Sequence, residues 1–479
     1  MLFNSVAFFI FFVIVYALYL LSNHRWQNRI LLVASYIFYG AWDWRFLSLI
    51  WLSTIVDYFC GLRIEQSDSI RMKKKFLWIS VGLNLSLLGF FKYCNFFAAN
   101  LQDLLSWVGL TVDMPTLKVV LPVGISFYTF QTMSYTIDIY KGKLKSTDKF
   151  FDFALFVAFF PQLVAGPIER AKNLLPQVLE KRKVCLQQFF EGCYLIFWGL
   201  FLKVFVADNL AAMVDPVFTK DPSNIQSGLD VLLAVYAFSF QIFGDFAGYS
   251  NIARGLSKCM GFEIMVNFRL PYFATNPQDF WRRWHISLST WLRDYLYISL
   301  GGNRKGSLMT YRNLFLTMVL GGLWHGAAWT FVVWGIFHGI LLVIYHAFQQ
   351  WKAGELKARP PERDFFLIKM IKVLFFYHVT CVGWLIFRSR SIHQLWVLLG
   401  KLFSGWSLSW FLDHKTVLGM FFVYLGYLVV IQMDQYFHDD LMVHYKRPVF
   451  FRGIHYFLLL IFVIIFGVTG AQEFIYFQF

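Results

Sequence analysis

Apolar segments of about 18 to 25 residues recur along the whole chain, and this recurrence limits the possible folds more than any other feature. The first segment, MLFNSVAFFIFFVIVYALYLLS at residues 1–22, has neither a basic start nor a small-residue cleavage site, so we expect a membrane helix there. Only 15% of the residues are charged and 58% are hydrophobic, a balance typical of membrane proteins. The sequence predicts an all-α polytopic membrane protein with roughly ten to twelve transmembrane helices.

Short basic clusters between the apolar segments give an expected orientation. The positive-inside rule places such clusters in the cytoplasm, and here they occupy residues 23–30, 63–75, 140–149 and 180–183. The stretch between the first two clusters must leave and return, with a turn near GAWDW. A loop at residues 95–117 and an acidic loop that begins near Asp208 are expected outside. The formal net charge of +15 therefore indicates cytoplasmic loops and no nucleic-acid partner.

Two further segments carry polar residues at membrane depth. FFDFALFVAFFPQLVAGPIER, residues 150–170, contains two prolines and a glycine, which predicts a re-entrant or broken helix whose backbone is covered by protein. Glu169 and Arg170 at its end are candidates to line a cavity. Asp245 lies in a later apolar segment, where we expect it either to form a buried salt bridge, with an arginine for example, or to orient a histidine.

The stretch NPQDFWRRWHISLSTWLRDYLYISLGG, residues 276–302, predicts one amphipathic helix that begins with Asn276 as its cap and Pro277 in its first turn. Helical geometry gathers one polar stripe about 80° wide, formed by Arg282, His285, Ser289 and Arg293. Tryptophans form a second stripe about 130° away. We expect an interfacial helix with tryptophans at headgroup depth and cations facing water or a cavity. An anchor that only touches lipid phosphates is the alternative, and the mostly neutral imidazole of His285 argues against it.

GGLWHGAAW, residues 321–329, places His325 inside an apolar segment. Desolvation keeps such a ring neutral and leaves one nitrogen able to accept a proton. The small neighbours allow a ligand or another backbone to approach closely. General-base catalysis and a packing role both remain open from the residues alone. His338 would lie about 20 Å further along a straight helix, so without a break near Gly326 it has a supporting role.

Several familiar site patterns are absent from the sequence. It contains no P-loop, no GxGxxG, no HExxH and no GxSxG, and its six cysteines form no CxxC pair. We therefore expect no nucleotide hydrolysis, no bound metal and no serine hydrolase.

Longer strings of polar and aromatic residues resemble a known family. NFRLPYFATNPQDFWRRWHISLSTWLRDYLYISLGGNR (267–304) and RNLFLTMVLGGLWHGAAWTFVVWGIFHG (312–339) closely resemble the membrane-bound O-acyltransferase family, in its bacterial alginate O-acetyltransferase membrane-component branch. LPVGISFYTFQTMSYTIDIYKG, FPQLVAGPIER and DFAGYSNIARG match the same branch. The likeness extends to about residue 347.

The resemblance implies a single integral-membrane acyltransferase domain over residues 1–479, with a motif-bearing core at about 118–347 and C-terminal helices at 366–479. It further implies a central funnel and two functional histidines, His325 as the expected catalytic residue and His285. The implied reaction moves acetyl from a cytoplasmic donor, acetyl-CoA, across the bacterial inner membrane for O-acetylation of an exported polysaccharide such as alginate or cellulose. A periplasmic SGNH-type acetyltransferase, polysaccharide export machinery and membrane lipid are the implied partners, and no cofactor stays bound.

A polyanionic donor needs cations at its entrance. The residues expected to hold it are Arg282, Arg283, Arg293, Ser289, Asn303 and Arg304, and the thioester would reach His325 through the small residues around it. Two alternatives remain: transfer of another acyl group, such as D-alanine, to a cell-wall polymer, and a membrane transporter with no chemistry of its own.

Overall fold

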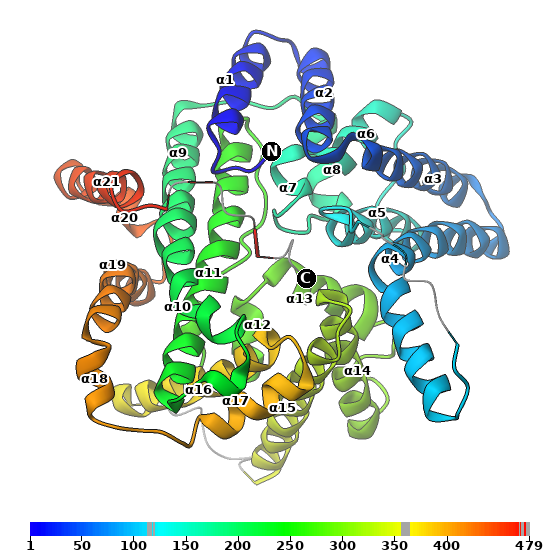
Figure 1. Ribbon diagram of the computed structural model, residues 1–479. Coiled ribbons are helices and arrows are strands. Elements are labelled where there is room, and N and C mark those ends of the chain that lie inside the picture. Colours follow the sequence, from blue (N-terminus) through cyan, green and yellow to red (C-terminus); the bar gives the residue numbers. More distant parts are fainter. Residues whose placement is uncertain (113–116, 118–119, 356–364, 469, 471–473, 476–479) are drawn as a thin grey trace. The chain divides into compact units, whose positions relative to one another are not determined.

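The computed structural model describes residues 1–112, 117, 120–355, 365–468, 470 and 474–475, and within these ranges it contains helices and no strands (Figure 1). Seven helical stretches are long and apolar enough to cross a membrane, and two shorter apolar helices accompany them. The prediction of an all-helical, multi-pass membrane protein is therefore confirmed. The count of ten to twelve crossings and the central funnel stay predictions.

Packing divides the chain into two compact units, Met1–Ile196 with Tyr249–Met265 and Phe197–Gly248 with Val266–Phe479. The single functional domain stays a prediction. The first unit contains α1 (Val6–Leu20), α2 (His24–Asp43), η1 (Trp44–Phe46), α3 (Leu47–Gln66), α4 (Ile70–Trp107), α5 (Ile125–Tyr140), α6 (Phe150–Ala158), α7 (Phe160–Leu163), α8 (Ala171–Leu179) and most of α9 (Leu186–Leu200).

The second unit contains most of α11 (Gly228–Cys259) and the helices that carry the predicted site. In chain order, the other helices of this unit are η2 (Phe201–Ala207), α10 (Asp208–Phe218), η3 (Pro222–Asn224), η4 (Pro271–Phe273), α12 (Pro277–Arg283), α13 (Ile286–Trp291), η5 (Leu292–Tyr297), α14 (Ser307–His325), α15 (Trp329–Glu355), α16 (Phe366–Arg388), α17 (Ile392–Lys401), α18 (Ser409–Asp413), α19 (Lys415–His438), α20 (Val443–Lys446) and α21 (Val449–Ile464). Two of them, η2 and η5, are π-helical.

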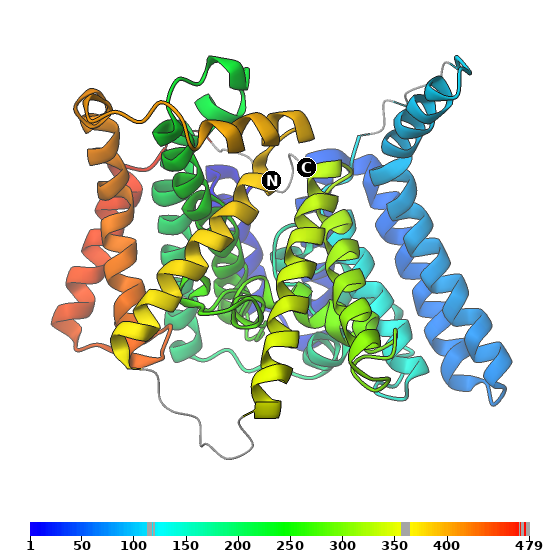
Figure 2. The same cartoon turned by 90° about the horizontal axis from the view of Figure 1, so that it is seen from below.

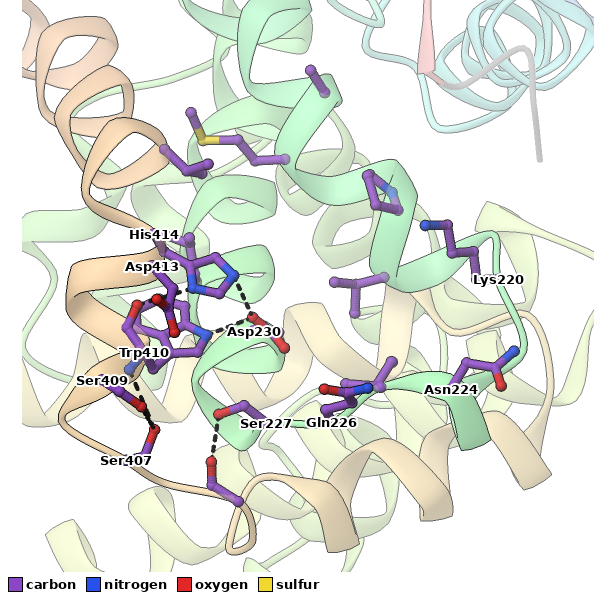
Figure 3. Close-up of a pocket in the computed structure, with 18 residues that line it drawn as sticks. Lys220, Asn224, Gln226, Ser227, Asp230, Ser407, Ser409, Trp410, Asp413 and His414 are labelled. Carbon is purple, nitrogen blue, oxygen red and sulfur yellow. Dashed lines mark hydrogen bonds and ion pairs between the residues drawn. The ribbon is translucent and has the colours of Figure 1, made fainter.

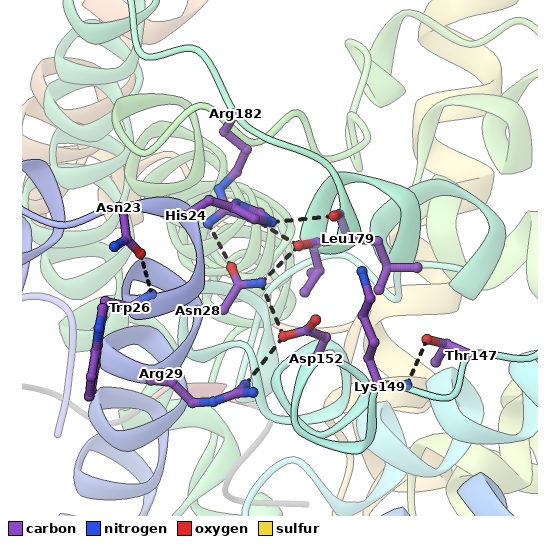
Figure 4. A network of polar contacts seen from close by, with 11 residues as sticks. Asn23, His24, Trp26, Asn28, Arg29, Thr147, Lys149, Asp152, Leu179 and Arg182 are labelled. Atoms are coloured by element: carbon purple, nitrogen blue, oxygen red, sulfur yellow. Dashed lines mark hydrogen bonds and ion pairs between the residues drawn. The ribbon is translucent and has the colours of Figure 1, made fainter.

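The first basic cluster is part of a helix and not a loop (Figure 4). The side chain of Asn28 donates to the Val178 carbonyl at 2.9 Å and accepts from the Arg182 guanidinium at 2.7 Å. Arg29 lies 3.3 Å from the Asp152 carboxylate. The prediction of a loop at residues 23–30 is therefore wrong, because these side chains fasten α2 to the segments around α6 and α8.

The other turns of the first unit agree only in part with those predicted from the sequence. α2 ends at Asp43, and its carboxylate accepts the Arg45 amide to start the turn into α3, as expected for GAWDW. The loop predicted at residues 95–117 is wrong as far as Trp107, because α4 continues to that residue. Residues 113–116 lie outside the described ranges.

The proline-interrupted segment is broken and buried, as predicted. Its helix ends at Ala158, resumes for four residues from Phe160 and stops again at Leu163. All residues from 153 to 170 are buried. Glu169 accepts a hydrogen bond from the Met265 amide at 2.5 Å, and burial raises the pKa of its carboxyl group to about 7. The broken backbone is thus covered by protein, which is the condition for tolerating it within a membrane.

A buried charge cluster holds part of the second unit together. The Lys203 ammonium lies 2.7 Å from Asp208 and 2.7 Å from Asp245. Gly248 allows this approach, since a Cβ there would stand 2.8 Å from the Gly199 carbonyl. The salt bridge expected for Asp245 is confirmed, with a lysine as the partner. Asp208 is buried in this cluster, so its assignment to an acidic loop is wrong.

Candidate functional site

His325 is the last residue of α14, at the tip of a helical hairpin. Gly326 leaves the helix with an extended backbone, and α15 begins at Trp329. The two helices run side by side in Figure 2, where they are yellow-green and yellow. Their backbones touch near the tip, because a Cβ on Gly322 would stand 2.9 Å from the Gly335 Cα atom. The helix thus breaks near Gly326. This break is the condition that the sequence set for His325 and His338 to approach each other.

The glycines around His325 admit parts of the protein itself. A Cβ at Gly326 would overlap the Phe331 ring, and one at Gly322 would overlap the Phe331 carbonyl oxygen. At Gly321 the nearest atom is a Leu292 methyl group at 3.1 Å. Phe331 and α15 therefore occupy the space beside Gly322 and Gly326, and the passage for the thioester along the small residues stays a prediction.

The predicted helix over residues 276–302 is broken at His285. Asn276 caps α12 by accepting the Asp279 amide, with Pro277 in the first turn, as predicted. Trp284 is extended, and His285 adopts φ +43° and ψ +54°, the left-handed region that non-glycine residues rarely occupy. A common stripe of Arg282, His285, Ser289 and Arg293 does not form, because it required one uninterrupted helix. The tryptophan stripe also fails as a membrane-surface feature, since Trp284 and Trp291 are buried in the protein.

Asn267 explains the unusual backbone at His285. Its Oδ1 atom accepts the Ser287 amide at 3.1 Å, the Ser287 hydroxyl at 2.9 Å and His285 Nδ1 at 3.2 Å. The Ser287 amide can only donate a hydrogen bond, so Asn267 Oδ1 is an acceptor. His285 Nδ1, which lies against the same oxygen, therefore carries the proton. The other ring nitrogen, Nε2, then bears the lone pair. Burial lowers the pKa of His285 to about 3, so the ring is neutral near pH 7.

The two predicted histidines come together from separate elements. Their ring centroids are 6.4 Å apart, and both side chains are buried. The surrounding rings approach the two imidazoles to between 4.6 and 5.5 Å. They belong to Phe246, Trp324, Trp334 and Phe387. Such a site excludes water and strengthens any electrostatic interaction made inside it, which suits proton transfer at a neutral imidazole.

His338 belongs to the wall of this site. Its ring lies 4.7 Å from Trp334, which also contacts His325 at 5.0 Å, and it stacks on Phe280 at 6.1 Å. Trp334 thus contacts both histidines of the hairpin. The supporting role of His338 stays a prediction that this packing favours.

The polar residues predicted to hold a donor are dispersed. Arg282, Asn303 and Arg304 are exposed, and Arg293 pairs with neighbouring Asp294 at 2.7 Å. Arg283 pairs with Asp279 at 2.7 Å. Ser289 donates to the Trp284 carbonyl at 3.2 Å and so supports the broken turn. The structure therefore brings together the two histidines, whereas the binding role of these six residues stays a prediction.

Sequence reasoning missed the residues that position the histidines. Asn267 lies 18 residues before His285, and no short-range pattern connects the two. Trp334 could have been found from the sequence, because it lies four positions before His338 and therefore on the same face of the helix. Lys203 could also have been found, since a lysine inside an apolar segment marks a buried polar cluster.

A separate polar cleft of about 730 Å³ opens between α10, the start of α11 and residues 405–417 (Figure 3). Asp230 accepts the Trp410 indole N–H at 2.7 Å, and His414 lies 3.5 Å from the same carboxylate oxygen. The Ser227 hydroxyl donates to the Gly405 carbonyl at 2.8 Å. None of the predicted site residues lines this cleft. In the described part of the chain, no group of three histidine, cysteine or acidic residues could hold a metal ion.

Comparison with known proteins gives consistent matches. A family model described as the membrane-bound O-acyltransferase family matches residues 143–384, which include both histidines. A Pseudomonas putida protein named "Probable alginate O-acetylase AlgI" is 45% identical over 414 residues, 85% of this chain and 82% of the relative. The peptidoglycan O-acetyltransferase of Helicobacter pylori is 36% identical, over 78% of this chain and 73% of the relative. The teichoic acid D-alanyltransferase of Bacillus subtilis is 30% identical, over 57% and 70%.

Proposed function

The chain belongs to the membrane-bound O-acyltransferase family and is an acyltransferase, and on this premise we propose that it carries acetyl groups across the bacterial inner membrane for O-acetylation of an exported polysaccharide. The donor is cytoplasmic acetyl-CoA and the acceptor is a periplasmic partner protein. The observation that carries the proposal is the pair of buried histidine rings 6.4 Å apart in an aromatic pocket. Family membership leaves no support for a transporter without chemistry.

The proposed chemistry is one acyl transfer with general-base help. The imidazole of His325 accepts the proton of the acceptor hydroxyl as its oxygen attacks the thioester carbonyl carbon. The carbon–sulfur bond then breaks, and the coenzyme leaves as a thiol after taking that proton. Help of this kind contributes about 10² to 10⁴ in rate. His285 is kept neutral by burial and is held in one tautomer by Asn267, and it orients the reacting groups next to His325.

The donor is drawn to the site by exposed cations. Arg282 and Arg304 are exposed and Arg293 is 60% exposed at its side chain, so their charges reach solvent. Arg283, Ser289 and Asn303 complete the set that we assign to the donor entrance. The coenzyme carries several phosphate charges, which such cations attract at long range. Raising the salt concentration should therefore raise the KM for acetyl-CoA.

The relatives support the acceptor that we propose. Proteins named for alginate and peptidoglycan O-acetylation cover most of this chain, which supports an exported polysaccharide as the final substrate. We propose a periplasmic SGNH-type acetyltransferase as the partner that receives the acetyl group, within the polysaccharide export machinery. Transfer of D-alanine to a cell-wall polymer is the second candidate, supported by the 30% identity to a teichoic acid D-alanyltransferase.

The test uses the full chain in inner-membrane vesicles with labelled acetyl-CoA. The variant His325→Ala should insert normally and lose acyl transfer, while His393→Ala, which changes an exposed histidine, should behave as the wild type. Normal transfer by His325→Ala would refute the proposal. Mass spectrometry of the extracellular polymer, from cells with and without the protein, distinguishes acetyl from D-alanyl groups.

A further inference from the structure

Two adjoining clefts of the second unit follow α16 and α19. One cleft has a volume of about 570 Å³ and lies at the start of α16 and the end of α19. The other has a volume of about 520 Å³ and lies beside the following residues of α16 and the preceding residues of α19. Phe273 and Val373 line both clefts. The two therefore form one continuous groove along a pair of candidate membrane spans.

The inner part of the groove is apolar and open to the surroundings of the helices. Phe422 is 68% exposed and Val429 is 37% exposed. From Phe421 to Gln432, α19 rises about 16 Å at 1.5 Å per residue. One leaflet of a membrane is about 15 Å deep, half of the hydrocarbon core. The apolar part thus has the length and the composition that suit one acyl chain.

The outer end of the groove is cationic. Its charged lining residues are Arg269, Arg283, Lys369, Asp439 and Asp440. Asp439 pairs with Arg269 at 2.9 Å, and Asp440 pairs with Lys446 at 2.7 Å. Lys369 is exposed and lies 5.0 Å from the Tyr436 ring, and no described carboxylate is within ion-pair distance of it. A cation without an acidic partner, at the mouth of an apolar groove, suits a phosphate that carries an acyl chain.

We propose that this groove, which we call the α16–α19 groove, binds one anionic phospholipid, with its phosphate at Lys369 and one acyl chain between α11, α16 and α19. Charge selects the headgroup, and the open apolar side lets the lipid enter from the bilayer. A soluble phosphate or coenzyme would occupy only the cationic end.

The same groove reaches the backbone that holds His285. Arg269 and Phe273 line it, and they belong to the segment that pairs with the broken helix. The Arg269 amide donates to the Arg283 carbonyl at 2.9 Å, and the Ile286 amide donates to the Asn267 carbonyl at 2.9 Å. A lipid in the groove therefore steadies the segment that sets His285. This consequence rests on the proposed function, whereas lipid binding does not.

The headgroup is tested on purified full-length protein reconstituted in vesicles of equal parts phosphatidylcholine and phosphatidylglycerol. Native mass spectrometry after detergent extraction then counts the retained lipids, and we expect phosphatidylglycerol in excess. Each unit of charge near an anionic headgroup changes retention about fivefold, so Lys369→Glu, a change of two units, should lower it about 25-fold. Lys372 lies on the same helix but does not line the groove, so the control variant Lys372→Glu should retain lipid normally. Equal retention of the two lipids, or equal effects of the two variants, would overturn the proposal.

The apolar part is tested by filling it. Gly426 lines the groove and has open space where a Cβ would stand, as does Gly419 on the same helix outside the groove lining. Gly426→Leu should lower phosphatidylglycerol retention to the level of phosphatidylcholine, and Gly419→Leu should not. Equal retention in these two variants, or retention of coenzyme A in place of phosphatidylglycerol, would refute an acyl-chain site. If the wild-type protein retains phosphatidylglycerol but transfers no acetyl group from acetyl-CoA, only the proposed function is contradicted.

Discussion

The close contact between α14 and α15 gives the sharpest prediction. The variant Gly322→Ala adds one methyl group where the Gly335 Cα atom would be 2.9 Å away, and carbon atoms pack at about 3.5 to 4.0 Å. The helices must therefore separate by about 0.6 to 1.1 Å. Backbone atoms cannot rotate away as side chains do, so the tip of the hairpin moves.

This displacement acts directly on the site. His325 follows Gly322 by three residues and must keep its contacts with His285 at 6.4 Å and with Trp334 at 5.0 Å. An error of 1 Å in a reacting group costs about 10²-fold in rate, while overpacking costs about 1 to 3 kcal/mol in stability. We expect kcat to fall about 100-fold in a protein that still folds.

The assay is acyl transfer from labelled acetyl-CoA in proteoliposomes, with thermal stability measured on the same preparation. Gly321→Ala is the matched control, because its new methyl group meets only a Leu292 methyl group at 3.1 Å, which can rotate away. The control should stay near the wild-type rate. A Gly322→Ala variant with wild-type kcat would refute the claim that helix contact sets the position of His325.

Three further predictions concern buried polar groups. Asn267→Ala removes the acceptor of three hydrogen bonds and should lower the stability by about 3 kcal/mol, whereas Ser287→Ala should lower it by about 1 kcal/mol. Thermal unfolding in detergent compares the two variants, and equal losses of stability would contradict the assigned geometry. The lowered pKa of His285, about 3, means that only the unfolded chain binds this proton between about pH 6.5 and 3. Acidification from about pH 7 to 5 should therefore lower the unfolding temperature less in His285→Gln than in the wild type, and an identical pH dependence would refute it. Lys203→Met leaves Asp208 and Asp245 buried without their cation and should cost about 3 to 5 kcal/mol, seen as lost folded protein by size-exclusion chromatography; unchanged yield would show that the cluster is dispensable.

Helices and interruptions were predictable where short-range signals dominate. The cap and proline at 276–277 start a helix, and the glycine after His325 ends one, because capping and backbone freedom act within a few residues. The proline-rich segment at 150–170 is broken for the same reason. Loop predictions from charge failed at residues 23–30, because basic and amide side chains also form hydrogen bonds inside a packed unit.

The sequence by itself determined that the chain is an all-helical membrane protein, and its polar-aromatic strings indicated the family. It also selected His285 and His325, since a histidine within apolar surroundings is costly unless it has a role. Only the tertiary structure decided that Asn267 turns the backbone at His285, that Phe331 fills the space beside Gly326, and that the predicted arginine stripe does not form. Those outcomes depend on contacts between residues far apart in the chain, where packing overrides the local helical preference that a sequence pattern records.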